Sequence, residues 1–256
     1  GYSDIELGVF WKQPPNDEER REVVELADGD LIRLYPYDAQ EEVWSDDFMM
    51  GRAASNLPQS GILVEVGHYT VDFMNRTLES VLQHYDPDEL KQNLISGVVD
   101  GLPLHNQVLL RQWQQQAQSY PDQLSVAVIN RHALIDHFWR CEMFLHRDQN
   151  FLLLYQTFSR VQIQILNVLS GLNHTYYFGF KWLDVVVKRL PIAPTDLLDR
   201  LRQVYQTEPA HGIQLLTTLV EETYDLVEQH MPQIDVDRLR RIFRYRRPFW
   251  EEPPPR

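Results

Sequence analysis

The sequence predicts a two-domain α+β protein, with a small mixed β-sheet domain at residues 1–104 and an α-helical bundle at residues 105–256. Short β-prone runs bounded by turn residues lie in the first part of the chain. After Asn106 the apolar residues follow helical spacing almost without interruption. Proline and glycine punctuate this second part at intervals that suit a bundle of helices.

Turn residues and alternation divide the first domain into short elements. We expect strands at about residues 4–11, 31–35 and 61–69. Asn16 and Glu19 form a capping-box pattern, which predicts a helix that runs to about residue 27. Thr70 is expected to cap a second helix at about residues 71–84. Residues 38–60 lack clear periodicity, and we expect an irregular excursion near a functional site there.

The second part of the chain is expected to be almost entirely helical. Residues 86–104 are transitional, with a short helix that starts at Asp86-Pro87-Asp88. The later helices are expected at about residues 106–118, 122–146, 150–170, 180–190, 195–206, 210–230 and 235–245.

Composition and charge indicate which partners and which compartment to expect. The net charge of −13 argues against a surface that coats nucleic acid, so nucleic acid is not an expected partner. No apolar run approaches the ~20 residues that cross a bilayer, and no membrane partner is expected. A single cysteine, Cys141, suits a reducing cytoplasm. The chain lacks an initiating Met, which suggests that it begins inside a longer protein. The oligomeric state stays open.

Two acids one residue apart mark the first strand. Alternation places Asp4 and Glu6 on one face of the strand, while Ile5 and Leu7 are expected to point into the core. Like charges this close repel each other, and a divalent cation with oxygen ligands relieves that repulsion. The alternative is an exposed strand face with two solvated acids.

A third acid lies in the strand at residues 61–69. Glu65 is flanked by Val64 and Val66, where a charge needs a partner. If this strand lies beside the first, Glu65 completes a cluster of three carboxylates. Asp72 is a competing candidate, but it falls in a first helical turn, where the helix dipole favours an acid without any catalytic role. We therefore prefer Glu65.

The arrangement of apolar-Asp-apolar-Glu-apolar on one strand and apolar-Glu-apolar on a later one resembles the nucleotidyltransferase superfamily, which includes DNA polymerase beta and the aminoglycoside nucleotidyltransferases. Over roughly residues 1–232, the chain is similar to bacterial nucleotidyltransferase-domain proteins with a helical C-terminal domain. The segments that carry this similarity are YSDIEL, LYPYD…VWSDDFMMG, LNHTYYFGFKWLDVV and LVEETYDLVEQH.

The resemblance implies a magnesium-dependent enzyme. It would move a nucleoside monophosphate from ATP or another nucleoside triphosphate to a hydroxyl of a small molecule, such as an aminoglycoside-like antibiotic. Asp4, Glu6 and Glu65 would bind two Mg²⁺ ions, and Glu65 would also accept the proton of the attacking hydroxyl.

The nucleotide needs ligands besides the metal. The resemblance implies a Gly-Ser turn upstream of the first carboxylate. The chain starts three residues before Asp4, so the N-terminal part of this domain is expected to be missing. Ser3 is a nucleotide-binding candidate, although it lies beside the metal strand and cannot replace that turn. Lys181, Tyr176 and Tyr177 are expected to contact the phosphates. The alternative is a surface lysine next to packed aromatic rings.

Two other functions stay open at this stage. One is a non-catalytic binding or regulatory module that keeps the nucleotidyltransferase fold. The other is an antitoxin-type enzyme that modifies a protein or RNA. Six arginines between Arg238 and Arg247 could bind phosphate or RNA, but we expect an exposed helix that offsets the acidic body.

Overall fold

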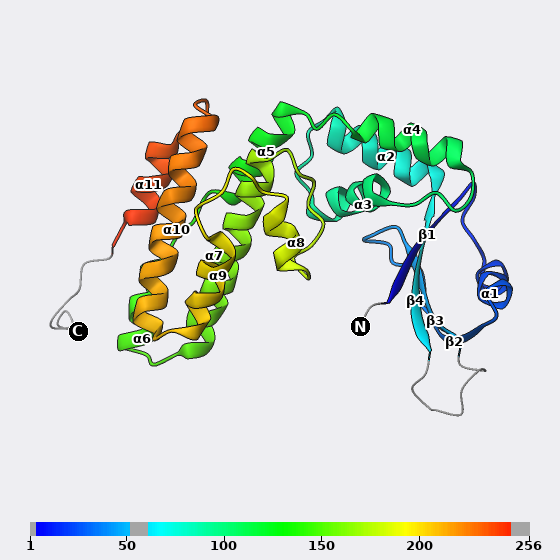
Figure 1. The fold of residues 1–256 in the computed structure, drawn as a ribbon, viewed down its shortest axis with the longest axis horizontal. Helices are drawn as coiled ribbons and strands as arrows, with labels where there is room; N and C mark the ends of the chain where they lie inside the picture. The colour runs from blue at the N-terminus through cyan, green and yellow to red at the C-terminus, as the bar shows by residue number, and fades with distance from the viewer. Residues whose placement is uncertain (1–3, 52–60, 247–256) are drawn as a thin grey trace, which may run out of the picture. The chain divides into compact units, whose positions relative to one another are not determined.

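The computed structural model describes residues 4–51 and 61–246. It confirms the α+β class, with a four-stranded mixed sheet near the N-terminus followed by a helical region (Figure 1). The chain forms two compact units, Gly1–Glu79 and Ser80–Arg256. The dividing point lies within helix α2 (Val71–Leu82), earlier than the boundary at residue 104 that the sequence suggested. The difference arises because α3 (Glu89–Asp100) packs against the helix that follows it.

The sheet of the first unit has the order β1-β4-β3-β2. Its strands are β1 (Ile5–Trp11), β2 (Gly29–Leu34), β3 (Trp44–Met50) and β4 (Ile62–Thr70). The edge strand β1 runs parallel to β4, whereas the other neighbouring strands are antiparallel. In the parallel pair Glu6 lies opposite Glu65.

One face of this sheet is covered by helix α1 (Asp17–Leu26), which begins with the predicted capping box of Asn16 and Glu19. Val24 of α1 belongs to a core with Phe48, Val64 and Val66. Leu7 packs against that core as predicted, but Ile5 does not, and 40% of Ile5 is exposed. Ile5 lies near the start of an edge strand, where less of the chain covers it.

Strand β3 corrects the prediction for residues 38–60. We expected an irregular segment, but Trp44–Met50 is a strand that pairs with β2 on one side and β4 on the other. The alternation was hidden because the buried face of β3 carries Asp46 next to Phe48, so a charged residue occupies a core position. Residues 52–60 lie outside the described part of the chain.

The buried carboxylate of Asp46 contacts two side chains, of which Arg20 carries the neutralising charge. Arg20 Nη1 lies 3.0 Å from Asp46 Oδ1, and His68 Nε2 donates to Asp46 Oδ2 at 2.8 Å. Trp11 Nε1 donates to His68 Nδ1 at 3.0 Å. Because an indole N–H can only donate, Nδ1 is the acceptor and His68 carries its hydrogen on Nε2. This network ties α1 to three strands of the sheet.

The second unit is built around helix α7 (Phe151–Leu172), whose residues from Ile165 to Leu172 are all buried. It contacts α5, α6 and α10. The other helices are α4 (Gln107–Ala117), α5 (Asp122–His132), α6 (Arg140–His146), α8 (Leu183–Lys188), α9 (Leu197–Gln206), α10 (Pro209–His230) and α11 (Val236–Arg244). Within the described residues, none of the helices is long and apolar enough to cross a bilayer.

The prediction of a single helix at residues 122–146 is wrong, because α5 and α6 are separate helices. Side chains from other helices bind the carbonyls at the end of α5. Tyr224 donates to Ala133 O at 2.8 Å, and Gln164 donates to His132 O at 3.2 Å and Leu134 O at 3.0 Å. His137 then adopts a positive φ of 55°, which helical residues do not have. These distant partners have no signature in the local sequence.

Replacing Asp46 with alanine should destabilise the protein strongly. The Asp46→Ala variant leaves the Arg20 guanidinium buried without its carboxylate, so we expect a loss of about 3–5 kcal/mol in the free energy of unfolding. Asp17→Ala is the matched control, since Asp17 also contacts Arg20 but is 75% exposed. The control should lose less than about 1 kcal/mol. Urea denaturation of both variants measures the difference, and equal losses would contradict the assignment.

The stability of the helical unit should depend on pH through the protonation of His132. Burial of the imidazole, and then the charge of Arg131, lower the pKa of His132 from 6.5 to about 4. Glu89 lies 3.5 Å from His132 Nε2, but its carboxylate already accepts a hydrogen bond from Asn167 at 2.9 Å. Between pH 6.5 and pH 4 the unfolded chain therefore binds one more proton at this position than the folded chain does.

The free energy of unfolding should consequently fall as the pH decreases through this window. We expect a contribution of roughly 1–3 kcal/mol from His132, whose side chain is 12% exposed. The variant His132→Gln lacks this group, so its unfolding free energy should fall less steeply between pH 6.5 and pH 4. Parallel slopes for the two proteins in urea titrations would show that His132 titrates normally.

Candidate metal centre

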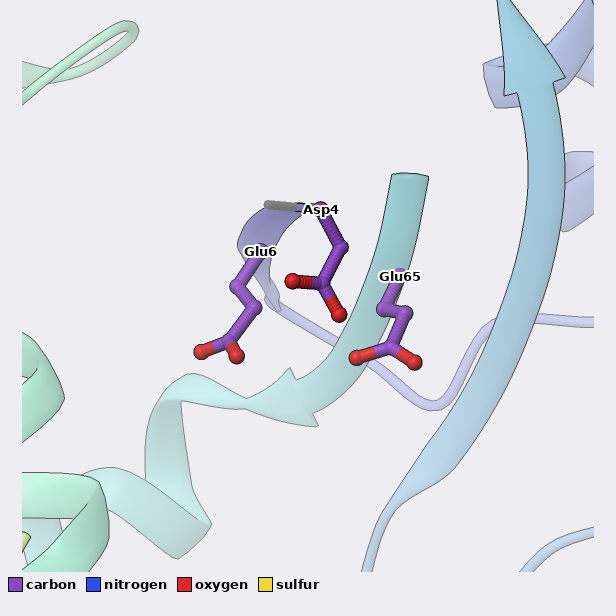
Figure 2. Close-up of side chains that lie close together, drawn as sticks. All are labelled: Asp4, Glu6 and Glu65. Atoms are coloured by element: carbon purple, nitrogen blue, oxygen red, sulfur yellow. The ribbon is translucent and has the colours of Figure 1, made fainter. Parts of the chain in front are cut away.

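Three carboxylates of the sheet unit meet on one face. Asp4, Glu6 and Glu65 each offer an oxygen, and these atoms all lie within 4.8 Å of one another. Figure 2 shows the three side chains converging from two neighbouring strands. The prediction that Glu65 lies beside Asp4 and Glu6 is therefore confirmed.

The strand register explains this convergence. Glu6 and Glu65 are partners in the parallel pair of β1 and β4, so both side chains leave the same face of the sheet. Asp4 precedes Glu6 by two residues and shares its face. On the opposite face of β4, the neighbours Val64 and Val66 are buried in the core. The apolar residues of β4 thus hold Glu65 outward.

The chemistry of this donor set fits a hard divalent cation. Carboxylate oxygens are the ligands that Mg²⁺ prefers in proteins, and Mg²⁺ usually keeps several waters or substrate oxygens. Asp4 is half-buried and Glu6 is exposed, so the cluster is accessible to water and substrate. Without a cation, three carboxylates at this separation repel one another. Asp4, Glu6 and Glu65 are therefore the residues that would hold Mg²⁺.

Asp47 is a neighbouring acid that sequence reasoning missed, since β3 was not expected. It lies opposite Glu65 in the β3–β4 pair, on the same face of the sheet. Tyr35 donates to Asp47 Oδ2 at 3.0 Å, and Arg33 in turn donates to the Tyr35 hydroxyl at 3.0 Å. Asp47 is thus engaged on the β2 side, and the three-carboxylate group does not include it.

An aromatic shelf lies next to the carboxylates. Gly8 is the partner of Gly67 and Phe10 is the partner of Tyr69, so two glycines and then two aromatic residues follow the glutamate pair on the same face. The rings of Phe10 and Tyr69 stack with centroids 5.6 Å apart. The Tyr69 ring lies so close to Gly67 that a Cβ there would come within 2.9 Å of it.

The sequence carried a signal for this shelf. Residues 6–10 read Glu-Leu-Gly-Val-Phe and residues 65–69 read Glu-Val-Gly-His-Tyr, so both strands repeat the pattern Glu-apolar-Gly-X-aromatic in register. The shelf also affects its own tyrosine. Burial raises the pKa of Tyr69, and the charges of Glu41 and Glu6 add to this shift. Tyr69 therefore stays a neutral hydroxyl near the carboxylates.

The other predicted site residues lie elsewhere. Ser3 falls outside the described part of the chain. Tyr176 is buried in the helical unit, and its hydroxyl donates to Ala117 O at 3.0 Å, which is the environment of a structural tyrosine. Tyr177 is half-buried and meets Phe180 edge to face. Lys181 is exposed in the turn before α8.

Asp72 occupies the position expected for the competing acid. It lies in the first turn of α2 and is exposed. The three-carboxylate group does not include it. This placement supports the choice of Glu65 over Asp72, and it makes Asp72 a suitable control residue.

We expect the carboxylate cluster to bind divalent cations. Calorimetric titration with Mg²⁺ or Mn²⁺ should give a binding signal that Glu65→Gln weakens at least tenfold, since even residues outside the ligand shell change metal affinity by roughly 10–100-fold. Asp72→Asn removes the same charge outside the cluster and should bind like the wild type. Equal affinity of the two variants would refute a metal centre at Glu65.

Comparisons with known proteins found no relative of this chain. No family model matches the chain, and neither the curated proteins nor the solved structures contain a match. The resemblance to nucleotidyltransferases therefore stays a prediction.

Proposed function

We propose that this protein is a magnesium-dependent nucleotidyltransferase. It would transfer a nucleoside monophosphate from ATP or another nucleoside triphosphate to a hydroxyl of a small molecule, with release of pyrophosphate. The observation that carries the proposal is the meeting of Asp4, Glu6 and Glu65, from adjacent parallel strands, with ligand atoms within 4.8 Å of one another. A reaction between a polyphosphate and a hydroxyl needs such a concentration of oxygen ligands on an accessible face.

Each carboxylate has a role in this proposal. Bound magnesium would neutralise phosphate charge and lower the pKa of the attacking hydroxyl. Asp4 and Glu6, at the start of β1, would act only as ligands of the cation. Glu65 also contributes a ligand oxygen, and its carboxylate accepts the proton of the acceptor hydroxyl. Glu65 is suited to this role because β4 is buried on its other face and fixes the position of the side chain.

The aromatic shelf of Phe10 and Tyr69 extends the site along the same face. A stacked pair next to the carboxylates offers an apolar surface for the base of the nucleotide or for the acceptor. The acidic face favours a cationic acceptor, such as an aminoglycoside-like amine. Tyr176 takes no part in this proposal, because its hydroxyl already donates to Ala117 O. We place this activity in the cytoplasm.

Transfer from α-labelled ATP to a panel of hydroxyl acceptors, in the presence of magnesium, tests the proposal. A positioned base contributes about 100-fold or more to the rate, so Glu65→Gln should lower the turnover number by at least that factor. The exchange keeps the size of the side chain. Asp72→Asn is the control and should retain wild-type turnover, because Asp72 is an exposed helical acid outside the cluster.

The outcomes separate the competing functions. Label on a small hydroxyl compound, lost in Glu65→Gln, supports the proposal. Label on a protein or RNA instead would identify an antitoxin-type enzyme. Wild-type protein that neither transfers label nor binds nucleotide in calorimetry would be a non-catalytic module, and Glu65→Gln with full turnover would remove Glu65 from the mechanism.

A further inference from the structure

A cavity of about 490 Å³ opens in the helical unit, between α11 and the segment that joins α5 to α6. Its lining residues are Asp136, His137, Arg238, Arg241, Ile242 and Tyr245. Three of them follow helical spacing, since Arg241 is three residues after Arg238 and Tyr245 is four residues after Arg241. One side of α11 and the residue that follows it thus present two guanidinium groups and a phenol ring to the cavity.

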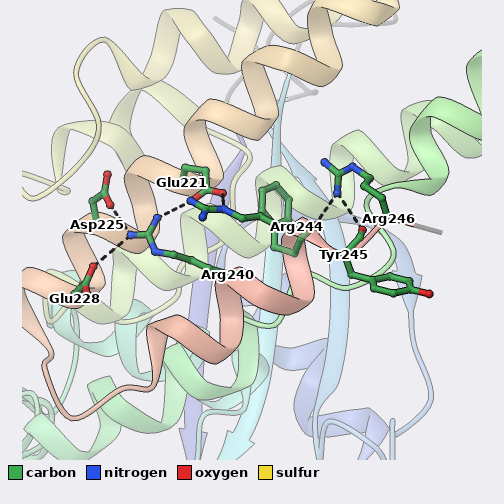
Figure 3. Close-up of polar contacts among 8 residues, drawn as sticks. Glu221, Asp225, Glu228, Arg240, Arg244, Tyr245 and Arg246 are labelled. Atoms are coloured by element: carbon green, nitrogen blue, oxygen red, sulfur yellow. Dashed lines mark hydrogen bonds and ion pairs between the residues drawn. The ribbon is translucent and has the colours of Figure 1, made fainter. Parts of the chain in front are cut away.

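The other arginines of this region are already used within the protein. Arg240 binds Glu221 at 2.6 Å, Glu228 at 3.4 Å and also Asp225, all on α10 (Figure 3). Arg244 donates to the two oxygens of Glu221 at 2.7 and 2.8 Å. These pairs fix α11 to α10, and they occupy both guanidinium groups with acids of α10.

Arg246 neutralises the negative end of the helix. Its guanidinium donates to Phe243 O at 3.0 Å and to Tyr245 O at 3.1 Å (Figure 3). The last carbonyls of a helix would otherwise repel an anion near the C-terminus. Arg246 thus binds one carbonyl of the last turn and places a positive charge at the end of α11.

Arg238 and Arg241 differ from these neighbours. Both are exposed, and across the described residues their guanidinium groups make no hydrogen bond or ion pair. The one acid of the cavity, Asp136, lies 3.5 Å from Arg160 and 3.4 Å from His137. The charge of Asp136 is therefore paired with Arg160, and the two guanidinium groups give the cavity a positive character.

The cavity also offers a flat apolar surface. Tyr245 is 57% exposed, and Ile242 lies one helical turn from Arg238. Paired guanidinium groups bind phosphate oxygens, and an exposed aromatic ring stacks on nucleobases. The volume lies within the range of about 300–1,000 Å³ that holds small ligands.

We propose that this cavity binds a nucleotide, with its phosphate on Arg238 and Arg241 and its base against Tyr245. The nucleotide is either free or part of a single-stranded nucleic acid, because both present the same phosphate and base. This site is independent of the carboxylate cluster, which lies in the sheet unit and carries the opposite charge.

Fluorescence anisotropy in EDTA tests the site without metal-dependent binding. The two probes are fluorescently labelled AMP and a labelled, unstructured oligoribonucleotide. The double variant Arg238→Ala/Arg241→Ala should weaken binding at least tenfold, because it removes both charge-assisted contacts with the phosphate. Tyr245→Ala should weaken binding about fivefold or more, which is the lower end of the effect of base stacking.

A matched control removes the same charge elsewhere in the helical unit. Arg111→Ala/Arg202→Ala deletes two exposed arginines outside the cavity and should leave the affinity unchanged. Glu65→Gln should also bind like the wild type, so failure of the transfer reaction and failure of this site can be told apart. Because Arg238 and Arg241 are exposed, circular dichroism should show that their variant folds normally.

Salt dependence identifies the source of the nucleotide. If a strand is bound, the oligonucleotide binds more tightly than AMP, and the double variant lowers the slope of log affinity against log salt by about 1.4, or 0.7 for each lost contact. If AMP binds as tightly as the oligonucleotide, the ligand is a free nucleotide. Absence of binding to both probes would overturn the proposal, and so would an equal loss of affinity in the control double variant.

Discussion

The parallel register between β1 and β4 is the constraint on which the candidate site depends. It places Glu6 opposite Glu65, although like charges at paired positions of a sheet are unfavourable. The register is fixed from the other face, because Leu7 and Val9 of β1 pack against the core that contains Val64 and Val66 of β4. A shift of β1 by one residue would turn Glu6 into that core and expose Leu7 and Val9. The hydrophobic effect on one face thus keeps two repelling carboxylates together on the other, where a cation would relieve the repulsion.

The covered face carries charge as well, and there the charge is balanced inside the protein. Asp46 is buried between Arg20 of α1 and His68 of β4, and Trp11 fixes the orientation of the His68 ring. A buried ion pair contributes little net stability, but it specifies which groups must meet. The network therefore links α1, β1, β3 and β4 in one arrangement. The sheet consequently separates two groups of acid residues, since Asp46 is paired under α1 while Asp4, Glu6 and Glu65 gather on the opposite face.

Local patterns of sequence predicted a large part of this fold. Alternation identified β1 and β4 and the shared face of Asp4 and Glu6, and the capping box located α1. The failures have a common cause, which is stabilisation by residues distant in the sequence. Strand β3 was missed because Asp46 holds a core position only with Arg20 and His68 as partners. The break after α5 was missed because Tyr224 and Gln164 bind its last carbonyls. The pattern Glu-apolar-Gly-X-aromatic is visible in the sequence, but it gains meaning only once the two copies are known to pair in register.

The arginines of α11 show why net charge is a poor guide to ligands. The chain carries a net charge of −13, which argues against nucleic acid as a general partner. Yet Arg240 and Arg244 form ion pairs with Glu221 and other acids of α10, while Arg238 and Arg241 line a cavity whose lining contains a single acid. The reach to α10 decides which arginines belong to each group, because Arg244 forms an ion pair with Glu221 although it lies only three residues from Arg241. Binding depends on the charge that remains within a few ångströms of the ligand, since more distant exposed charges are screened at physiological salt. An acidic protein can therefore carry a site for phosphate, and the distribution of ion pairs on α11 indicates where that site lies.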